Sequence, residues 1–237
     1  MHGPVLVVKA GDTLPGIAAT CRDYDAWFAR ALYLPTVVCQ AHRGEPPPPP
    51  RDCRGAIITG SPHSILDDAP WMRDLCDWIR RAEEVGVPLL GVCFGHQLIG
   101  HAFGCRVERN PRGWELGTRE VSLTEEGRRD PLFEDMPENF VAQVSHRDHL
   151  ADLSGRVRLL AGNGHSAIQA IAVGETVRGV QFHPEADPTI ARLFITARAD
   201  VLRDAGLDPE TLAAGVAAAP LQARVLANFQ KNFAKRG

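Results

Sequence analysis

The chain has 237 residues, of which 44% are hydrophobic, and its 26 basic and 29 acidic residues give a formal net charge of −3. This balance, without a strong block of either sign, gives no support for binding to nucleic acid or to a membrane surface. The apolar stretches are strand-sized and the N-terminus lacks a basic segment followed by an apolar core, so we expect neither a signal peptide nor a transmembrane helix.

The first part of the chain alternates between buried strands and amphipathic helices. A run of five prolines, Pro46–Pro50, interrupts this pattern and predicts a stiff connector into the next strand. Strand and helix alternation of this kind is typical of a doubly wound, mostly parallel α/β sheet, with functional residues beyond the carboxyl ends of its strands. The expected strands are 5–8, 36–40, 56–58 and 87–92, and the expected helices are 24–34, 71–84 and 95–103.

The pattern changes after Cys105, where shorter β-like segments predict a small antiparallel edge on the same sheet. These segments are 119–123, 140–144, 157–160, 167–173 and 177–182, and helices are expected at 189–204, 209–217 and 221–235. We expect residues 1–237 to form a single domain, because this length suits one large α/β domain better than two.

Cys93 is the cysteine whose surroundings predict chemistry. The six cysteines are widely spaced in a chain large enough to fold without disulfides, which indicates a reduced, cytoplasmic protein. Cys93 lies between Gly91 and Gly95, where an apolar strand turns sharply into a helix. This is the cysteine counterpart of the serine nucleophile elbow, in which the neighbours of a strained central residue must lack side chains. The helix N-terminus would favour the thiolate form of the cysteine.

A second apolar strand ends in His183-Pro184-Glu185. An activated cysteine requires a base to accept its proton and a group to orient that base. His183 is suited to the first role and Glu185 to the second, while Pro184 restricts the backbone between them. The two motifs are 90 residues apart, so the fold must bring them together.

Other polar residues near these motifs have plainer interpretations. His96 could serve as a base, but we expect it to pack on the helix side because the elbow presents the thiol toward the strand ends. Cys93, His96, His101 and Cys105 would have to bind a metal from positions spread along a helix, so we expect no metal site. We expect Asp148, His149 and His165 to be solvated loop residues and Gln97 either to bind substrate or to cap the helix.

Together these motifs resemble those of the class I glutamine amidotransferases of the Cys-His-Glu type. The matching segments are Gly91-Val92-Cys93-Phe94-Gly95-His96-Gln97 and Phe182-His183-Pro184-Glu185. Thr59-Gly60-Ser61-Pro62 fits the family's oxyanion loop, and Ser145-His146-Arg147-Asp148 resembles a segment of the amidotransferase part of GMP synthetases. The ordered matches span about residues 55–185.

The resemblance implies a role for each matching residue. Cys93 would attack the γ-carbonyl of a glutamine-like substrate and form a γ-glutamyl thioester, with His183 and Glu185 completing the triad. The amides of Gly60 and Phe94 would stabilise the oxyanion. Substrate would be bound by Gln97, Ser145 and His146, the last through its backbone, and Trp114-Glu115-Leu116-Gly117 would line the same pocket. The resemblance implies no cofactor.

Three functions remain open on this basis. The protein could be a stand-alone glutaminase that passes ammonia to a separate synthetase subunit, since the chain lacks a Gly-x4-Gly-Lys-Ser/Thr loop. It could be a γ-glutamyl peptidase acting on glutathione-like substrates, because residues 110–117 resemble the corresponding segment of the plant enzymes. The third alternative is an inactive scaffold that binds a partner. We interpret residues 197–223 as a helical insertion that either covers the site or makes a homodimer contact.

Overall fold

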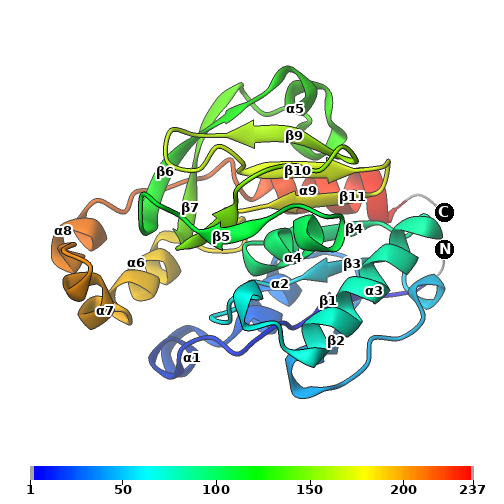
Figure 1. Ribbon diagram of the computed structural model, residues 1–237, viewed down its shortest axis with the longest axis horizontal. Helices are drawn as coiled ribbons and strands as arrows, with labels where there is room; N and C mark the ends of the chain where they lie inside the picture. The colour runs from blue at the N-terminus through cyan, green and yellow to red at the C-terminus, as the bar shows by residue number, and fades with distance from the viewer. Residues whose placement is uncertain (1–2, 236–237) are drawn as a thin grey trace.

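The computed structural model describes residues 3–235, which form a mixed nine-stranded sheet covered by helices on both faces (Figure 1). The strand order is β2-β1-β3-β4-β11-β10-β9-β6-β7. The parallel strands are β1 (Val5–Val8), β2 (Thr36–Cys39), β3 (Gly55–Ile58), β4 (Leu89–Val92) and β11 (Val177–Val180). The predicted doubly wound α/β fold is confirmed.

The antiparallel edge is also present and begins at β11. Its further strands are β10 (Ala170–Val173), β9 (Val157–Gly162), β6 (Glu115–Leu123) and β7 (Asn139–His146). A separate two-stranded sheet pairs β5 (Val107–Arg109) with β8 (Asp148–Leu150). These two strands were not predicted, because three residues are too few to show an alternating pattern.

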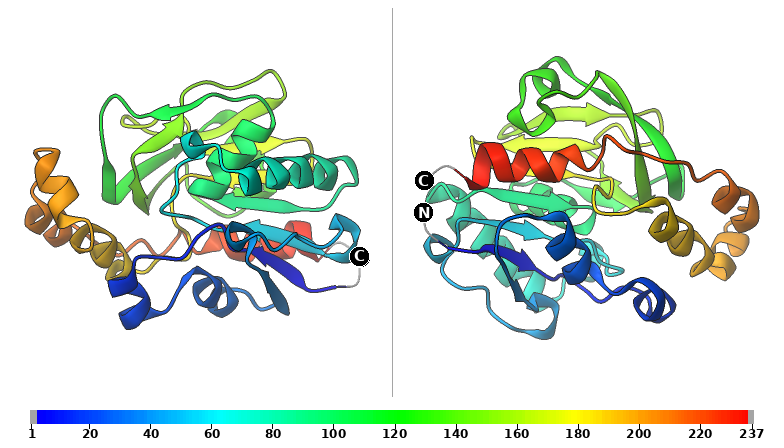
Figure 2. Two further views of the ribbon diagram at one scale, coloured as in Figure 1. Left: turned by 60° about the horizontal axis from the view of Figure 1, so that its bottom comes forward. Right: turned by 180° about the vertical axis from the view of Figure 1, so that it is seen from behind.

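Helices on the two faces bury the apolar residues of alternating strand positions. On one face lie α3 (Pro70–Glu84) and α4 (Phe94–Ala102), which pack against residues such as Leu6 and Ile58. On the other lie α2 (Tyr24–Ala31) and α9 (Arg224–Phe229), which pack against Val7 and Ile57; a π-helical turn, Gln230–Ala234, continues α9. Figure 2 shows α9 lying along the sheet in the view from behind.

A helical arm projects from one end of the sheet (Figures 1 and 2). It comprises α6 (Pro188–Thr196), α7 (Ala199–Asp204) and α8 (Pro209–Ala214). The single helix expected at 189–204 is two helices in the structure, because the first ends at Thr196 and the second begins at Ala199. Two short helices, α1 (Pro15–Cys21) and α5 (Glu125–Arg129), were not predicted; each buries a single residue, so neither carries an amphipathic pattern.

Within residues 3–235, no helix is long and apolar enough to cross a membrane.

Candidate active site

Cys93 lies in the sharp turn between β4 and α4, with φ 52° and ψ −102°. Positive φ is rare for a residue with a side chain and marks local backbone strain. The flanking glycines are sterically required, since a Cβ on Gly91 would lie 2.3 Å from the carbonyl oxygen of Gly95 and one on Gly95 would lie 2.3 Å from that of Ile58. The turn therefore has the geometry predicted for a nucleophile elbow.

His183 follows β11, the strand that pairs in parallel with β4, so both motifs reach the same edge of the sheet. The amide of Cys93 donates to the carbonyl of Val180 at 2.9 Å, which ties the two strand ends together. His183 Nδ1 lies 2.8 Å from Glu185 Oε1, and both side chains are buried. The 90-residue separation in sequence is thus closed by one strand pairing.

The pKa of His183 is raised to about 10, although burial alone would lower it. The main causes of the rise are the negative charges of Glu185 and Cys93, together with the hydrogen bond between the imidazole and Glu185. The direction of this shift favours the charged imidazolium form of His183, which contacts Glu185 at 2.8 Å.

The amides of Gly60 and Phe94 are the predicted oxyanion donors. Within residues 3–235, neither amide donates a hydrogen bond to a protein acceptor. Phe94 begins α4, and Gly60 follows β3 at the same sheet edge. A Cβ on Gly60 would lie 3.0 Å from His183 Cε1, so a side chain here would press against the imidazole.

A cavity of about 480 Å³ opens above Cys93 and is lined by each of the predicted substrate-binding residues. The Ser145 hydroxyl is buried and has no hydrogen-bond partner in the described part of the chain, and the Ser145 carbonyl lies 3.9 Å from Cys93 Sγ. Gln97 donates to the Asp148 carbonyl at 2.8 Å and to Gln181 Oε1 at 3.0 Å, so its amide nitrogen is already engaged.

His146 is fixed beneath the cavity by a buried polar network. Its Nε2 lies 2.9 Å from Glu115 Oε2 and its Nδ1 lies 3.0 Å from the Asp148 carbonyl. Glu115 also accepts hydrogen bonds from Asn163 and Gln169. Burial raises the pKa of Glu115, but the hydrogen bond and the charge of His146 lower it by more, so the net shift of the pKa is downward. The His146 side chain is therefore committed to contacts within the protein. Trp114 lines the cavity as expected, whereas Glu115 is buried against His146.

Other residues lie differently from what their sequence context suggested. Asp148 was expected to be a solvated loop residue, and this is wrong: it is buried in β8 and accepts from Arg109 at 2.7 Å. His149 and His165 are also partly buried rather than fully solvated. His96 is fully buried against Gly179 of β11, and burial lowers its pKa to about 3, so it stays neutral as expected for a packing residue.

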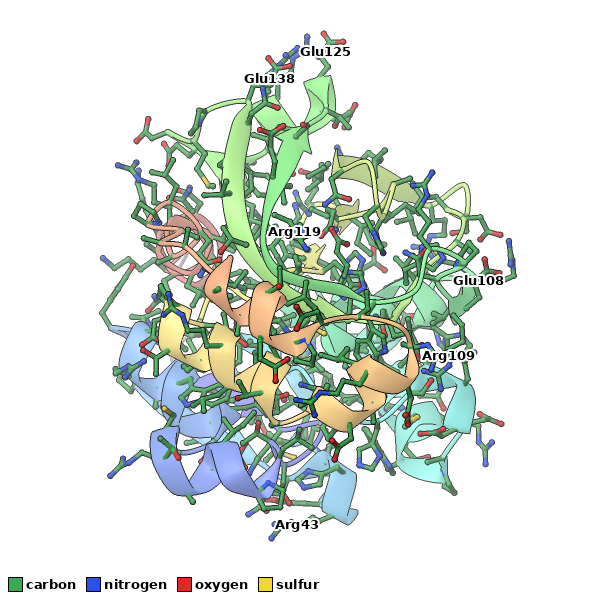
Figure 3. All side chains as sticks on the ribbon, turned by 90° about the vertical axis from the view of Figure 1, so that its left-hand side faces the viewer. Arg43, Glu108, Arg109, Arg119, Glu125 and Glu138 are labelled. Carbon is green, nitrogen blue, oxygen red and sulfur yellow. The ribbon has the colours of Figure 1, made fainter. Side chains whose placement is uncertain are left out.

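Sequence reasoning did not identify the arginines of the cavity, Arg109, Arg147 and Arg198. Arg198 comes from the arm together with Ala197 and Val201, so the start of the predicted insertion forms one wall of the cavity. Figure 3, which faces this end of the molecule, shows the arm crossing in front of the sheet with Arg109 beside it. No local motif marks Arg198, because it reaches the cavity only through the way distant segments pack together.

Comparison with known proteins agrees with this geometry. The family model for the class-I glutamine amidotransferases matches residues 36–199. Gamma-glutamyl peptidase 4 of Arabidopsis thaliana is 31% identical over 133 residues, which cover 55% of this chain and 53% of that protein. The GMP synthase (glutamine-hydrolyzing) of Thermosipho melanesiensis is 34% identical over 135 residues, which cover 56% of this chain and 24% of that protein. The chain thus spans about half of the one relative and a quarter of the other.

Solved structures show the same fold across nearly the whole chain. A glutamine amidotransferase from Thermotoga maritima superposes with a TM-score of 0.75 at 19% identity, covering 99% of this chain and 100% of that chain. A glutamine amidotransferase from Methylobacillus flagellatus gives a TM-score of 0.76 at 22% identity, covering 100% and 98%.

Proposed function

The chain belongs to the class-I glutamine amidotransferase family, and from this premise we propose that it hydrolyses γ-glutamyl amide bonds with Cys93 as the nucleophile. The observation that carries the proposal is the meeting of three features at one sheet edge. These are the strained Cys93 elbow, the buried His183–Glu185 pair on the neighbouring strand, and the free amides of Gly60 and Phe94.

The reaction begins from the thiolate of Cys93 and the imidazolium of His183. The thiolate attacks the γ-carbonyl carbon, and the amides of Gly60 and Phe94 donate to the oxyanion that forms; each such donor contributes about 3–4 kcal/mol in comparable acyl-transfer sites. The carbon–nitrogen bond then breaks as His183 gives its proton to the leaving nitrogen, which departs as ammonia or an amine. A γ-glutamyl thioester remains on Cys93.

Water completes the cycle. His183, now neutral, accepts a proton from a water molecule as its oxygen attacks the thioester carbonyl. The carbon–sulfur bond breaks, glutamate leaves and the thiolate–imidazolium pair is restored. Glu185 stays ionised throughout and holds the imidazole by the hydrogen bond to Nδ1. Gln97, Ser145 and the backbone of His146 bind the amino and carboxylate groups of the γ-glutamyl part.

Two activities are compatible with this mechanism, and they differ in the group that leaves from the γ-glutamyl bond. A glutaminase releases ammonia, with a separate synthetase subunit as its acceptor, whereas a γ-glutamyl peptidase releases an amino acid or peptide. The cavity of about 480 Å³ favours the second, because glutamine alone would leave much of it unfilled. The similarity to gamma-glutamyl peptidase 4 points the same way.

The proposal is tested with purified protein and a panel of glutamine, glutathione and γ-glutamyl amides, assayed separately for glutamate and for ammonia. We expect glutamate release from at least one substrate, and Cys93→Ala to lower it by about 10⁴-fold or more. Cys76→Ala, which removes a buried thiol on α3, is the matched control and should retain activity. Unchanged turnover in Cys93→Ala would refute the proposal, and glutamate without ammonia would identify the peptidase.

A further inference from the structure

The helical arm places an arginine in the cavity that contains Cys93. Arg198 lies between α6 and α7 and lines the cavity with Ala197 and Val201. We propose that Arg198 binds a carboxylate on the leaving side of the γ-glutamyl bond and thereby selects γ-glutamyl amino acids or peptides over glutamine. This inference rests on the proposed hydrolysis of γ-glutamyl bonds and names the substrate class of that site.

The Arg198 guanidinium is held in place by two aromatic rings and one carbonyl. Its carbon Cζ lies 5.6 Å from the ring centroid of Phe194 and 5.9 Å from that of Trp114. Nη1 donates to the Phe194 carbonyl at 2.9 Å. These contacts orient the planar group before a ligand arrives, which lowers the entropic cost of binding.

The positive charge of Arg198 is not neutralised by the protein. Within residues 3–235, Arg198 forms no ion pair. The two carboxylates that line the cavity are engaged elsewhere: Asp148 with Arg109 at 2.7 Å and with the Ser64 hydroxyl at 2.5 Å, and Asp67 with the Ser64 amide at 3.0 Å. An oriented guanidinium without a carboxylate partner is suited to binding one from a ligand.

Arg198 lies on the side of the site from which the leaving group departs. The ring of Phe194, over which Arg198 lies, has its centroid 5.1 Å from that of His183, and His183 gives its proton to the leaving nitrogen. Arg198 and Cys93 line the same cavity, so a substrate bound at the thiol can reach the guanidinium. The residues proposed to bind the γ-glutamyl part come instead from α4 and β7.

The test compares γ-glutamylglycine with γ-glutamylglycinamide, which differ only in the carboxylate of the leaving group. We expect wild-type kcat/KM to be about 10- to 100-fold higher for γ-glutamylglycine, the range of one charge-assisted contact. In Arg198→Gln this preference should fall to about threefold or less, and Arg198→Lys should restore part of it. Arg203→Gln is the matched control, because Arg203 lies on α7 but pairs with Asp200 and Glu210 outside the cavity.

Equal losses on both substrates in Arg198→Gln would overturn the inference, because a role in folding or in binding the γ-glutamyl part would not depend on the leaving group. We expect Arg147→Gln to lower kcat/KM equally for the two substrates, because Arg147 lines the cavity directly after Ser145 and His146, which are proposed to bind the γ-glutamyl part.

Calorimetric binding to Cys93→Ser separates this inference from the proposed function. If Cys93→Ser binds γ-glutamylglycine more tightly than γ-glutamylglycinamide, and the double variant Cys93→Ser/Arg198→Gln does not, the role of Arg198 is supported. This holds even if the wild type hydrolyses neither compound, a result that would refute only the proposed hydrolysis. Equal binding of the two compounds, or no binding of either, overturns the role of Arg198 whether or not hydrolysis occurs.

Discussion

Two buried histidine–glutamate pairs lie at the candidate site and differ in what they do. His183 and Glu185 are two residues apart, and their contact of 2.8 Å raises the pKa of an imidazole beside the thiol. His146 and Glu115 come from paired positions of β7 and β6, and their contact of 2.9 Å lies behind the cavity. We propose the first pair for proton transfer, whereas the second pair fixes His146 at the edge of the cavity.

At this scale, Glu115→Ala tests the second pair. The substitution leaves His146, Asn163 and Gln169 without their buried acceptor, and loss of one partner of a buried pair costs about 3–5 kcal/mol. We expect that loss in the free energy of unfolding from chemical denaturation. Glu120→Ala, at an exposed position of the same strand, should stay within about 0.5 kcal/mol of wild type. Equal stability of the two variants would contradict the proposed role of Glu115.

At the scale of elements, the site depends on how closely α4 approaches the parallel strands. Gly95 lies against the carbonyl of Ile58, at the end of β3, and Gly91 lies against the first turn of α4. Side chains at these positions would separate the helix from the sheet and move both Cys93 and the amide of Phe94.

Gly95→Ala should therefore destabilise the protein and disturb the site together. Its Cβ would lie 2.3 Å from a backbone oxygen, and overpacking of this kind costs about 1–3 kcal/mol or more. The midpoint temperature of thermal unfolding and the rate of glutamate release are both expected to fall. The control, Gly164→Ala, meets no atom within 4 Å and should leave both unchanged. A Gly95→Ala protein with wild-type stability and activity would show that the close approach is not required.

The elements also explain how far sequence reasoning could reach. Cys93 and His183 could be proposed from the sequence because each belongs to a short motif whose neighbours, Gly91, Gly95 and Pro184, have a local steric purpose. Asp148 was wrongly expected to be solvated because its burial arises from pairing between β5 and β8, which no periodic pattern signals. Arg198 was missed because it reaches the site only through the way the arm folds back.

At the scale of the whole molecule, the helical arm contacts both the cavity and the sheet. Gln222, which follows the arm, accepts from the Gln143 amide at 2.7 Å and donates to the Ala186 carbonyl at 2.6 Å. These contacts connect the end of the predicted 197–223 insertion to β7 and to the segment after Glu185. Residues at the start of this insertion line the cavity, which favours the interpretation that the insertion covers the site. A homodimer contact stays a prediction, which a measurement of the protein's mass in solution would test.

Global stability should depend on pH through His96. Burial lowers its pKa to about 3, whereas the unfolded chain takes up the proton near pH 6.5, so the unfolded state binds more protons in between. The contribution of His96 to stability is therefore complete above pH 6.5 and is lost as pH falls toward 3, by up to about 1.4 kcal/mol per pH unit. In His96→Gln this loss should be absent, so denaturation between pH 7 and 4 should show a shallower decline than in wild type. If the free energy of unfolding falls equally with pH in wild type and in His96→Gln, His96 is not the cause of the loss.

The most direct test of the central claim is covalent labelling with a glutamine-analogue electrophile, followed by peptide mass spectrometry. The account predicts one adduct on Cys93 and none on the five other cysteines, because four of these are buried and burial raises the pKa of their thiols. Replacing Glu185 with Gln should slow the labelling, because it removes the charge that holds His183 as an imidazolium. A folded protein that forms no adduct on Cys93 would contradict the account and favour a scaffold that binds a partner without turnover.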